Sequence, residues 1–315
     1  MSLLDTALDR SIAIGYSKLG YAIRKAQWDA NDPRPESLTG RTVVVTGATS
    51  GIGAAIAERA ASLGAHVVIV GRNGARADDV RRDITDRHRG ATVSIELGDV
   101  SDLGSVPDLA TRLASHGVDV IMHNAGVMPQ KWTAATNGHE LSLATHVLGP
   151  ILLTDLLVPQ LTSSPDARVI FMSSGGMYTA ELPVDDLDYH DSEYRGATAY
   201  ARSKRVQVAM VPILAERWKD AGAMVAGMHP GWVATPGVAD SLPGFNKVAG
   251  PLLRNAEQGA DTAVWLAATE PTPETGKFWQ DRAERPEHYL RRTRFSEDER
   301  RAVWREVCSW AGVTP

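Results

Sequence analysis

Short apolar runs rich in β-branched residues recur from residue 42 onward, and helix-forming stretches separate them. The runs lie at residues 43–45, 67–70, 93–97, 118–122, 169–172 and 224–228. Continuous apolar runs are typical of strands buried on both faces, whereas half-exposed strands alternate apolar and polar residues. Strands that alternate with helices build parallel sheets through crossover connections. The pattern therefore predicts a doubly wound α/β fold, a single Rossmann-type domain.

Two extensions flank the predicted domain at residues 40–280. Residues 1–39 contain one amphipathic helix, and its apolar positions are Leu4, Leu8, Ile12, Tyr16, Leu19 and Ile23. We expect this helix to pack on its own domain or on a second subunit. Adsorption to a membrane surface, helped by Lys18, Arg24 and Lys25, is the less favoured alternative.

The C-terminal part contains a short predicted strand at residues 276–279 and then a tail at residues 281–315. Ser296 and Glu299 form a capping-box pattern before an arginine-rich helix, so we expect a helical tail packed on the domain. Acidic residues interrupt the arginines of residues 282–294, which favours a solvated or self-paired face.

Composition excludes several classes of function. The formal net charge of -5 gives no basic field for nucleic acid. The one cysteine, Cys308, cannot form an intrachain disulfide, and nine scattered histidines show no metal-ligand spacing, so we expect no metal site. No run has the length of a membrane span, and the first residues lack the order of a signal peptide. These features predict a cytoplasmic protein that acts on a small molecule.

A glycine-rich turn follows the first predicted strand and precedes a helix-forming stretch at residues 54–59. Glycines allow the backbone to approach a pyrophosphate closely, and a helix N-terminus offers unpaired N–H groups and a favourable dipole. The turn residues that we expect to bind a dinucleotide cofactor are Gly47, Thr49, Ser50, Gly51, Ile52 and Gly53.

The end of the second predicted strand indicates which cofactor is bound. An acidic residue at this point would bind the 2′-hydroxyl of NAD. The chain has Gly71 followed by Arg72, whose planar fork suits a 2′-phosphate. NADP(H) is therefore preferred, with NAD(H) as the alternative cofactor. The competing interpretation of Arg72 is a surface arginine that caps the next helix.

Tyr200 and Lys204 are four residues apart, which places them on one face of a helix. A phenol titrates near pH ~10, and a neighbouring cation favours its phenolate form. We therefore expect Lys204 to lower the pKa of Tyr200 and to make the phenol a usable proton donor.

Together, the glycine turn and the Tyr200/Lys204 pair resemble the short-chain dehydrogenase/reductase superfamily over residues 40–280. Further motifs follow in the order of the family. They are Asp99-Val100, Asn124-Ala125-Gly126, Ser173-Ser174 and Pro230-Gly231. Residues 276–282 resemble the branch of dehydrogenase/reductase member twelve.

The resemblance implies a role for each matching residue. Asp99 and Val100 would hold the adenine, while Asn124, Ala125 and Gly126 would line the cofactor channel. Pro230, Gly231, Val233 and Thr235 would lie against the cofactor, with Thr235 at the nicotinamide carboxamide. Asp99 as the cap of a turn and Asn124 as a brace of the central strand are the structural alternatives.

The resemblance also implies the chemistry of carbonyl reduction. Tyr200 would donate the proton, Lys204 would also bind the nicotinamide ribose, and Ser174 would hydrogen-bond the substrate oxygen. Ser173 precedes the position that the family uses and would point to the opposite side of the strand. His146 stands where many relatives have the asparagine that serves a proton relay, so it is either a relay member or a satisfied core histidine.

We therefore expect an NADP(H)-dependent oxidoreductase that interconverts a carbonyl and an alcohol. Residues 175–199 would form one wall of the substrate cleft, and residues 236–253 a lid opposite. The side chains expected to make this cleft apolar are Met177, Trp232, Leu242 and Phe245. The resemblance implies a homo-oligomer. The alternative is a catalytically drifted NADP(H)-binding sensor or scaffold, which the change at His146 favours.

Overall fold

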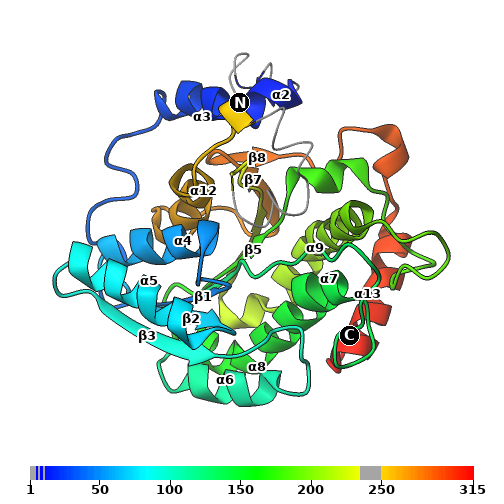
Figure 1. Ribbon diagram of the computed structural model, residues 1–315, viewed down its shortest axis with the longest axis horizontal. Coiled ribbons are helices and arrows are strands. Elements are labelled where there is room, and N and C mark those ends of the chain that lie inside the picture. Colours follow the sequence, from blue (N-terminus) through cyan, green and yellow to red (C-terminus); the bar gives the residue numbers. More distant parts are fainter. Residues whose placement is uncertain (1–4, 6–7, 10, 235–249) are drawn as a thin grey trace.

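The computed structural model describes residues 5, 8–9, 11–234 and 250–315. Its centre is an eight-stranded sheet in the order β3-β2-β1-β4-β5-β6-β7-β8, parallel except for β8 (Figure 1). The strands are β1 Thr42–Thr46, β2 His66–Gly71, β3 Thr92–Leu97, β4 Val120–His123, β5 Arg168–Met172, β6 Met224–Met228, β7 Lys277–Gln280 and β8 Ala283–Arg285. The predicted doubly wound α/β fold is confirmed.

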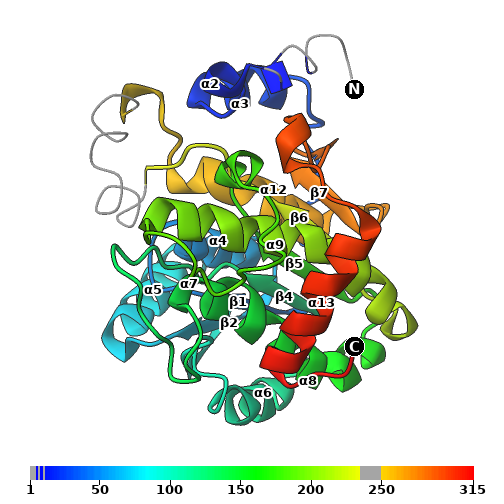
Figure 2. The ribbon, with the colours of Figure 1, turned by 90° about the vertical axis from the view of Figure 1, so that its right-hand side faces the viewer.

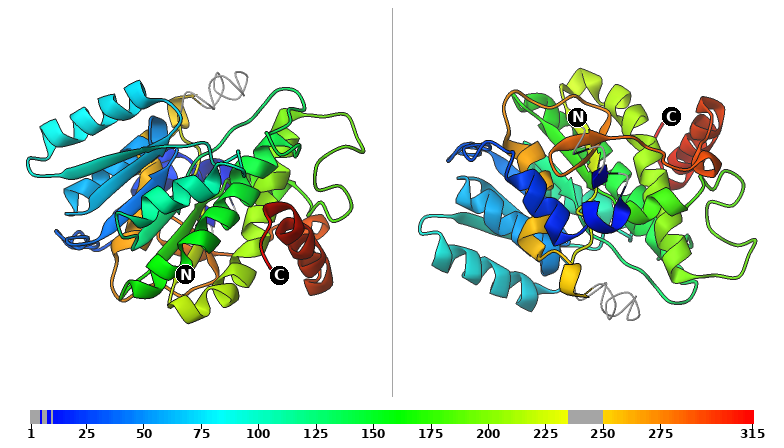
Figure 3. Two further views of the ribbon diagram at one scale, coloured as in Figure 1. Left: turned by 90° about the horizontal axis from the view of Figure 1, so that it is seen from below. Right: turned by 90° about the horizontal axis from the view of Figure 1, so that it is seen from above.

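Helices cover both faces of the sheet (Figure 3). Those that carry the core are α4 Gly51–Ser62, α5 Gly74–Arg87, α6 Val106–Ala114, α8 Gly149–Ser163, α9 Gly196–Arg217 and α12 Ala256–Ala268. Helices α4, α5 and α12 pack on one face, and α6, α8 and α9 pack on the other. Along β1, Val43 and Val45 enter the first core and Val44 the second. This alternation between two apolar layers explains why the run Val43–Val45 has no polar residue.

Strand β8 was not predicted from the sequence. It pairs antiparallel with β7 through a two-residue turn, Asp281-Arg282, which lies just after the expected domain boundary at residue 280. Both turn residues have positive φ, 50° and 59°, although neither is glycine. Such conformations cost roughly 1–3 kcal/mol each and persist only where surrounding contacts hold them.

The N-terminal extension is not one continuous helix. Helix α2 (Ile12–Gly15) ends before Ser17, and Ser17 begins α3 (Lys18–Lys25) by accepting hydrogen bonds from Leu19 N–H and Gly20 N–H. Leu8 and Tyr16 are buried as expected, but the break leaves Leu19 52% exposed, so the expected apolar face is wrong at Leu19. The segment packs on its own domain near β7, β8 and α12, as the preferred interpretation predicted (Figure 1).

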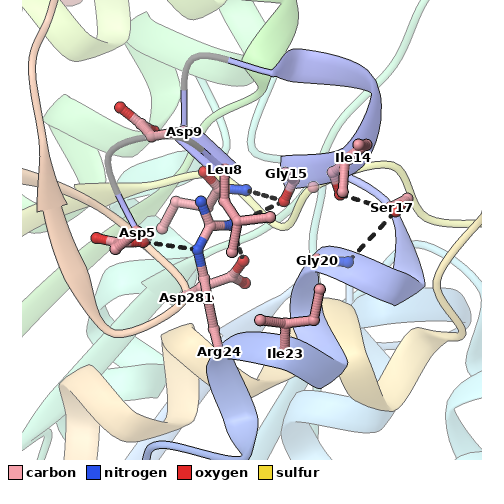
Figure 4. Close-up of polar contacts among 12 residues, drawn as sticks. Asp5, Leu8, Asp9, Ile14, Gly15, Ser17, Gly20, Ile23, Arg24 and Asp281 are labelled. Atoms are coloured by element: carbon pink, nitrogen blue, oxygen red, sulfur yellow. Dashed lines mark hydrogen bonds and ion pairs between the residues drawn. The ribbon is translucent and has the colours of Figure 1, made fainter. Parts of the chain in front are cut away.

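Buried ion pairs hold this segment in place (Figure 4). Arg24 donates to Asp5 and to Asp281 at 2.8 and 2.7 Å, and Arg254 binds Asp281 at 2.6 Å. Arg285 pairs with Asp5 at 2.9 Å. We call Asp5, Arg24, Arg254, Asp281 and Arg285 the N-terminal ion cluster. Arg24 is therefore a buried anchor and not part of a membrane-facing basic set.

The C-terminal tail forms helix α13 (Glu297–Ala311), which lies along α8 and α9 (Figure 2). The predicted capping box of Ser296 and Glu299 is confirmed. The prediction of a solvated arginine face before this helix was wrong for two residues. Arg285 is 2% exposed, and Arg282 binds Asp261 at 2.7 Å and lies over the ring of Trp28.

One helical stretch, Leu141–Ser163, is long and apolar enough to cross a membrane by length and composition alone. It comprises α7 (Leu141–Leu143), a π-helical turn at Ala144–Leu148 and α8. Its most apolar part is 72% buried inside the domain, where Leu153 and Leu157 are fully covered. This burial accounts for its composition as that of a central core helix.

Candidate functional site

A cleft of about 660 Å³ lies at the carboxyl end of the parallel strands. Residues that follow β1, β2, β3, β4, β5 and β6 line it, together with the N-terminal part of α9. Ligands of open α/β sheets bind at this edge, because the crossover connections diverge there. The volume lies within the range of roughly 300–1,000 Å³ of small-molecule sites.

The glycine turn after β1 forms one end of the cleft. Gly47 has φ of 68°, and a Cβ atom there would lie 2.7 Å from the Cα atom of Ala125. A Cβ atom on Gly53 would lie 2.4 Å from Nδ2 of Asn124. Ser50 occupies the N-cap of α4 without a side-chain cap bond, so the first turn of α4 keeps N–H groups for a ligand. The six predicted turn residues all line the cleft.

Arginine side chains occupy the cleft beyond β2. Gly71 packs against Thr49, with only 2.4 Å between its would-be Cβ atom and Thr49 Cγ2. Arg72 lines the cleft and uses one nitrogen, Nη1, to bind Asp99 at 3.2 Å. Arg76, on the first turn of α5, also lines the cleft, and its side chain has no ion pair with any residue in the described ranges.

Asp99 both lines the cleft and caps a turn, so its two interpretations are compatible. Its Oδ1 atom accepts hydrogen bonds from the N–H and hydroxyl of Ser101, at 2.9 and 2.7 Å. Burial raises the pKa of Asp99, but the bonds from Ser101 and Arg72 outweigh burial and lower this pKa below its usual range. Val100 lies beside it in the cleft wall. Asp99 therefore carries a negative charge at neutral pH.

Asn124 braces the centre of the sheet. Its Nδ2 atom donates to the carbonyls of Thr46 and Gly47, at 3.0 and 3.2 Å. The hydroxyl of Thr46 in turn accepts from the N–H groups of Asn124 and Ala125, both at 3.1 Å. Asn124, Ala125 and Gly126 all line the cleft. These bonds fix the end of β4 to the glycine turn, so the structural interpretation of Asn124 holds alongside its place in the cleft.

Ser174 and Tyr200 meet at the other end of the cleft. Ser174 follows β5, and Tyr200 lies in the second turn of α9. Burial raises the pKa of Tyr200, while a hydrogen bond with Ser174 opposes this shift. Ser173 points away from the cleft and donates to the carbonyl of Lys204 at 3.2 Å, as the alternation along the strand predicted.

Lys204 lies behind Tyr200 and is 1% exposed. Its Nζ atom donates to the carbonyl of Met172 at 2.6 Å and lies 5.7 Å from the centre of the Tyr200 ring. Burial lowers the pKa of Lys204 to about 7. The pKa of Tyr200 is raised and not lowered as predicted, because burial, which favours the neutral phenol, is the largest cause of its shift.

His146 lies in the π-helical turn and is fully buried. Its Nε2 atom accepts from the N–H of Val127 at 3.1 Å, so the proton of the neutral ring is on Nδ1. Nδ1 donates to Ser203 Oγ at 2.8 Å, and Ser203 donates to the carbonyl of Tyr200 at 2.9 Å. Burial and the charge of Lys204 lower the pKa of His146 well below its usual value. These contacts match the satisfied core histidine, and neither ring nitrogen is left for a relay.

The residues predicted to follow β6 and lie against the cofactor do not all line the cleft. Gly231 and Val233 line the cleft, but Pro230 does not, and its carbonyl instead accepts from Arg254 at 3.1 Å. Thr235 lies outside the described residues, as do Leu242 and Phe245.

The predicted cleft walls are correct only in part. Trp232 lines the cleft, whereas Met177 is a core residue with no exposed surface. Of the expected wall at residues 175–199, Gly175, Gly176, Thr179 and Ala197 line the cleft.

Arg76, Met128 and Ala201 are cleft residues that the sequence interpretation missed. Arg76 carried a usable signal, because a cation in the first turn of a helix opposes the helix dipole and therefore calls for another reason to be there. Met128 and Ala201 gave no such signal, since apolar residues near a strand end and within a helix are ordinary core residues.

Comparison with known proteins identifies the family. The sequence family described as short chain dehydrogenase matches residues 41–244. Dehydrogenase/reductase SDR family member 12 of Bos taurus is 38% identical over 279 residues, covering 87% of this chain and 86% of that protein. A candidate daunorubicin C-13 ketoreductase, DnrU, of Streptomyces sp. (strain C5) is 37% identical over 253 residues, covering 78% and 84%.

A solved structure shows the same fold. It is a candidate NAD(P)-dependent gluconate 5-dehydrogenase from Beutenbergia cavernae with bound NADP, and it matches with a TM-score of 0.64 and 27% identity. The match covers 78% of this chain and 96% of that one. On the match of its sequence, fold and strand-end motifs, the chain belongs to the short-chain dehydrogenase family.

Proposed function

We propose that the protein is an NADPH-dependent reductase of apolar ketones or aldehydes. One observation carries this proposal: a single cleft holds a glycine turn and helix N-terminus at one end and Ser174 with Tyr200 at the other. A cofactor pyrophosphate fits the first end, because Gly47 and Gly53 let the turn pack closely against Ala125 and Asn124, and the first turn of α4 keeps N–H groups for an anion. The bound NADP of the gluconate 5-dehydrogenase relative supports the same cofactor class.

The residues of this chain would divide the reaction as follows. NADPH supplies a hydride to the carbonyl carbon. Ser174 donates a hydrogen bond to the carbonyl oxygen, and Tyr200 gives its phenolic proton to that oxygen as negative charge develops. The raised pKa of Tyr200 keeps the phenol protonated at neutral pH, which suits an acid. Lys204 holds the strand end at Met172 and provides positive charge behind the phenol when it is protonated.

His146 has a positioning role in this proposal. Its bond to Ser203 and the bond from Ser203 to the Tyr200 carbonyl fix the turn of α9 that carries the phenol. The rings of His146 and Tyr200 meet edge to face, with centres 5.2 Å apart. The sensor or scaffold alternative rests on the change at His146, and these contacts support a positioning role for His146 instead.

The substrate is proposed to be apolar and bulky. Val127, Met128 and Trp232 are apolar side chains that line the cleft, and they support this proposal. The named substrate of the Streptomyces relative, daunorubicin, supports a polycyclic ketone.

The test of this function uses purified full-length protein with NADPH and a set of carbonyl compounds. We expect NADPH to bind, as measured by fluorescence titration, and to be consumed faster with polycyclic or aromatic ketones than with small polar ketones. Failure to bind NADPH would refute the proposal. Consumption only with small polar ketones would refute the substrate class alone.

Cofactor preference depends on Arg72 and Arg76. A charge-assisted hydrogen bond contributes about 1.5–3 kcal/mol, so Arg72→Ala or Arg76→Ala should weaken NADPH binding by about tenfold or more. NADH binding should change little, because NADH lacks the 2′-phosphate. Arg81→Ala is the matched control, since Arg81 lies on the same helix and pairs with Asp78. If Arg72→Ala and Arg76→Ala lost as much affinity for NADH as for NADPH, the result would contradict binding of the 2′-phosphate by these arginines.

A further inference from the structure

Tyr16, in the break between α2 and α3, contacts the two loops that line the reactive end of the cleft. Its ring lies against Gly175, where an added Cβ atom would come within 2.5 Å of Tyr16 Cε2. Gly175 directly follows Ser174 and lines the cleft. The ring centre also lies 4.6 Å from that of His229 and 6.1 Å from that of Trp232. Tyr16 is 2% exposed and does not itself line the cleft.

The backbone of Tyr16 binds the second loop. Its carbonyl accepts from the N–H of Trp232 at 2.8 Å. Gly231, with φ of 77°, leaves room for this carbonyl, because a Cβ atom there would lie 2.7 Å from it. Gly231 and Trp232 line the cleft across from Gly175. One residue of the N-terminal segment therefore joins the loop after β5 to the loop after β6.

The N-terminal ion cluster fixes the position of Tyr16. The carbonyl of the preceding Gly15 accepts three hydrogen bonds, from Arg24 at 2.8 Å, Arg254 at 3.0 Å and Gln280 at 3.2 Å. Figure 4 shows Arg24 reaching between Gly15 and Asp281. A Cβ atom on Gly15 would lie 2.2 Å from the carbonyl oxygen of Leu8, so only glycine fits there. The position of the ring is therefore set by buried charges.

The hydroxyl of Tyr16 contributes little to this arrangement. It is buried and has no hydrogen-bond partner among the described residues. The Tyr16 hydroxyl does not line the cleft, so the group is not a second proton donor. The ring and the backbone carbonyl carry the contacts with the two loops.

We propose that Tyr16 is a positioning residue that holds Ser174 and the Gly231–Trp232 turn in reacting geometry, so that the N-terminal segment is part of the active site. This inference rests on the proposed reductase function. Small misplacements of reacting groups can lower the reaction rate about a hundredfold. Binding of a ligand at contacts far from those groups is then kept. Loss of the Tyr16 ring should therefore lower the rate of the reaction more than it lowers the affinity for the adenosine end of the cofactor.

The test compares Tyr16→Phe, Tyr16→Ala and Leu38→Ala in the full-length protein. Tyr16→Phe keeps the ring and should retain the kcat/KM of the parent. Tyr16→Ala should lose about tenfold to a hundredfold in kcat/KM, with a change in NADPH affinity below about threefold. Leu38 is a fully buried residue of the other core layer, so Leu38→Ala should lower the melting temperature and leave kcat/KM unchanged.

A second pair of variants keeps the proposal testable if Tyr16→Ala does not fold. Gly175→Ala places a methyl group against the ring and should lower kcat/KM, and Tyr16→Leu in the same chain should restore part of it by removing the clash. Parent-like kcat/KM in Gly175→Ala would overturn the proposal, as would parent-like kcat/KM in a folded Tyr16→Ala. Absence of NADPH turnover in the parent would instead refute the proposed function itself.

Discussion

Tyr200→Phe is expected to lower kcat/KM for carbonyl reduction by about a hundredfold to ten-thousandfold while NADPH still binds. The variant keeps the aromatic ring, and hence its contact with His146, and removes only the hydroxyl that meets Ser174. Without the phenolic hydroxyl, the side chain at position 200 cannot protonate the alkoxide that develops from the carbonyl. Steady-state kinetics with a ketone found active for the parent, together with NADPH titration, measure both effects.

The control for this variant is Tyr189→Phe. Tyr189 also donates its hydroxyl, to the carbonyl of Glu193 at 3.2 Å, but it does not line the cleft. Its ring lies under Arg202, and phenylalanine keeps that contact. We expect parent-like kinetics. Activity of Tyr200→Phe within a few-fold of the parent would remove Tyr200 as the proton donor.

Asp281→Asn is expected to lower the free energy of unfolding by about 3–5 kcal/mol, the usual cost of breaking a buried ion pair. The two carboxylate oxygens bind Arg254 at 2.6 and 2.8 Å and Arg24 at 2.7 Å, and all three side chains are buried. An amide would leave the buried Arg254 without its counter-charge and leave Arg24 with Asp5 alone. Denaturant unfolding at pH 7 measures the loss.

The same variant has a defined dependence on pH. Burial raises the pKa of Asp281, but Arg254 and Arg24 outweigh burial and lower it below the ordinary value. The unfolded chain then binds the proton more readily, so the stabilisation is complete above pH ~4 and is lost as pH falls through the folded pKa. The difference in stability between the parent and Asp281→Asn should therefore shrink below pH ~4.

The exposed Asp83→Asn is the control for the charge change. It should change the free energy of unfolding by less than about 0.5 kcal/mol, because substitutions at exposed sites away from special contacts have small effects. A loss below about 1 kcal/mol for Asp281→Asn would show that the buried pairs do not anchor the N-terminal segment.

The sheet could be predicted because its strands have apolar sequences and are also buried between two apolar layers. Val43, Val44 and Val45 each enter an apolar layer, so no polar residue interrupts the run. Strand β8 has no such apolar sequence. Its sequence, Ala283-Glu284-Arg285, has no β-branched residue, and the turn before it has no glycine. Contacts with distant side chains stabilise this hairpin, among them those of Asp281 with Arg254, of Arg282 with Asp261 and of Arg285 with Asp5.

Buried charges were the main failure of the sequence interpretation. Arg24 and Asp281 are 257 positions apart, so neither residue indicates that the other will neutralise it. A charged side chain without a visible partner is ordinarily expected at the surface. The same reasoning put Arg24 in the basic set of the less favoured membrane alternative and Arg285 on a solvated or self-paired face.

The sequence predicted most of the residues that line the cleft, but it did not predict the directions of their pKa shifts. Helical spacing puts Tyr200 and Lys204 on one face, and the strand ends bring the other residues together. Spacing does not give the direction of a flexible side chain, and the Nζ atom of Lys204 binds the carbonyl of Met172. The degree of burial, which determines the direction of both pKa shifts, depends on the complete fold.

The N-terminal ion cluster also sets the order in which the protein can be completed during synthesis. Arg24 leaves the ribosome early, whereas its partner Asp281 follows 257 positions later, a delay on the order of ten seconds or more at ordinary translation rates. During that interval Tyr16 has no fixed place, because Arg254 and Gln280, which hold the carbonyl before it, are also still missing. The reactive end of the cleft can therefore be completed only after Asp281 has been synthesised.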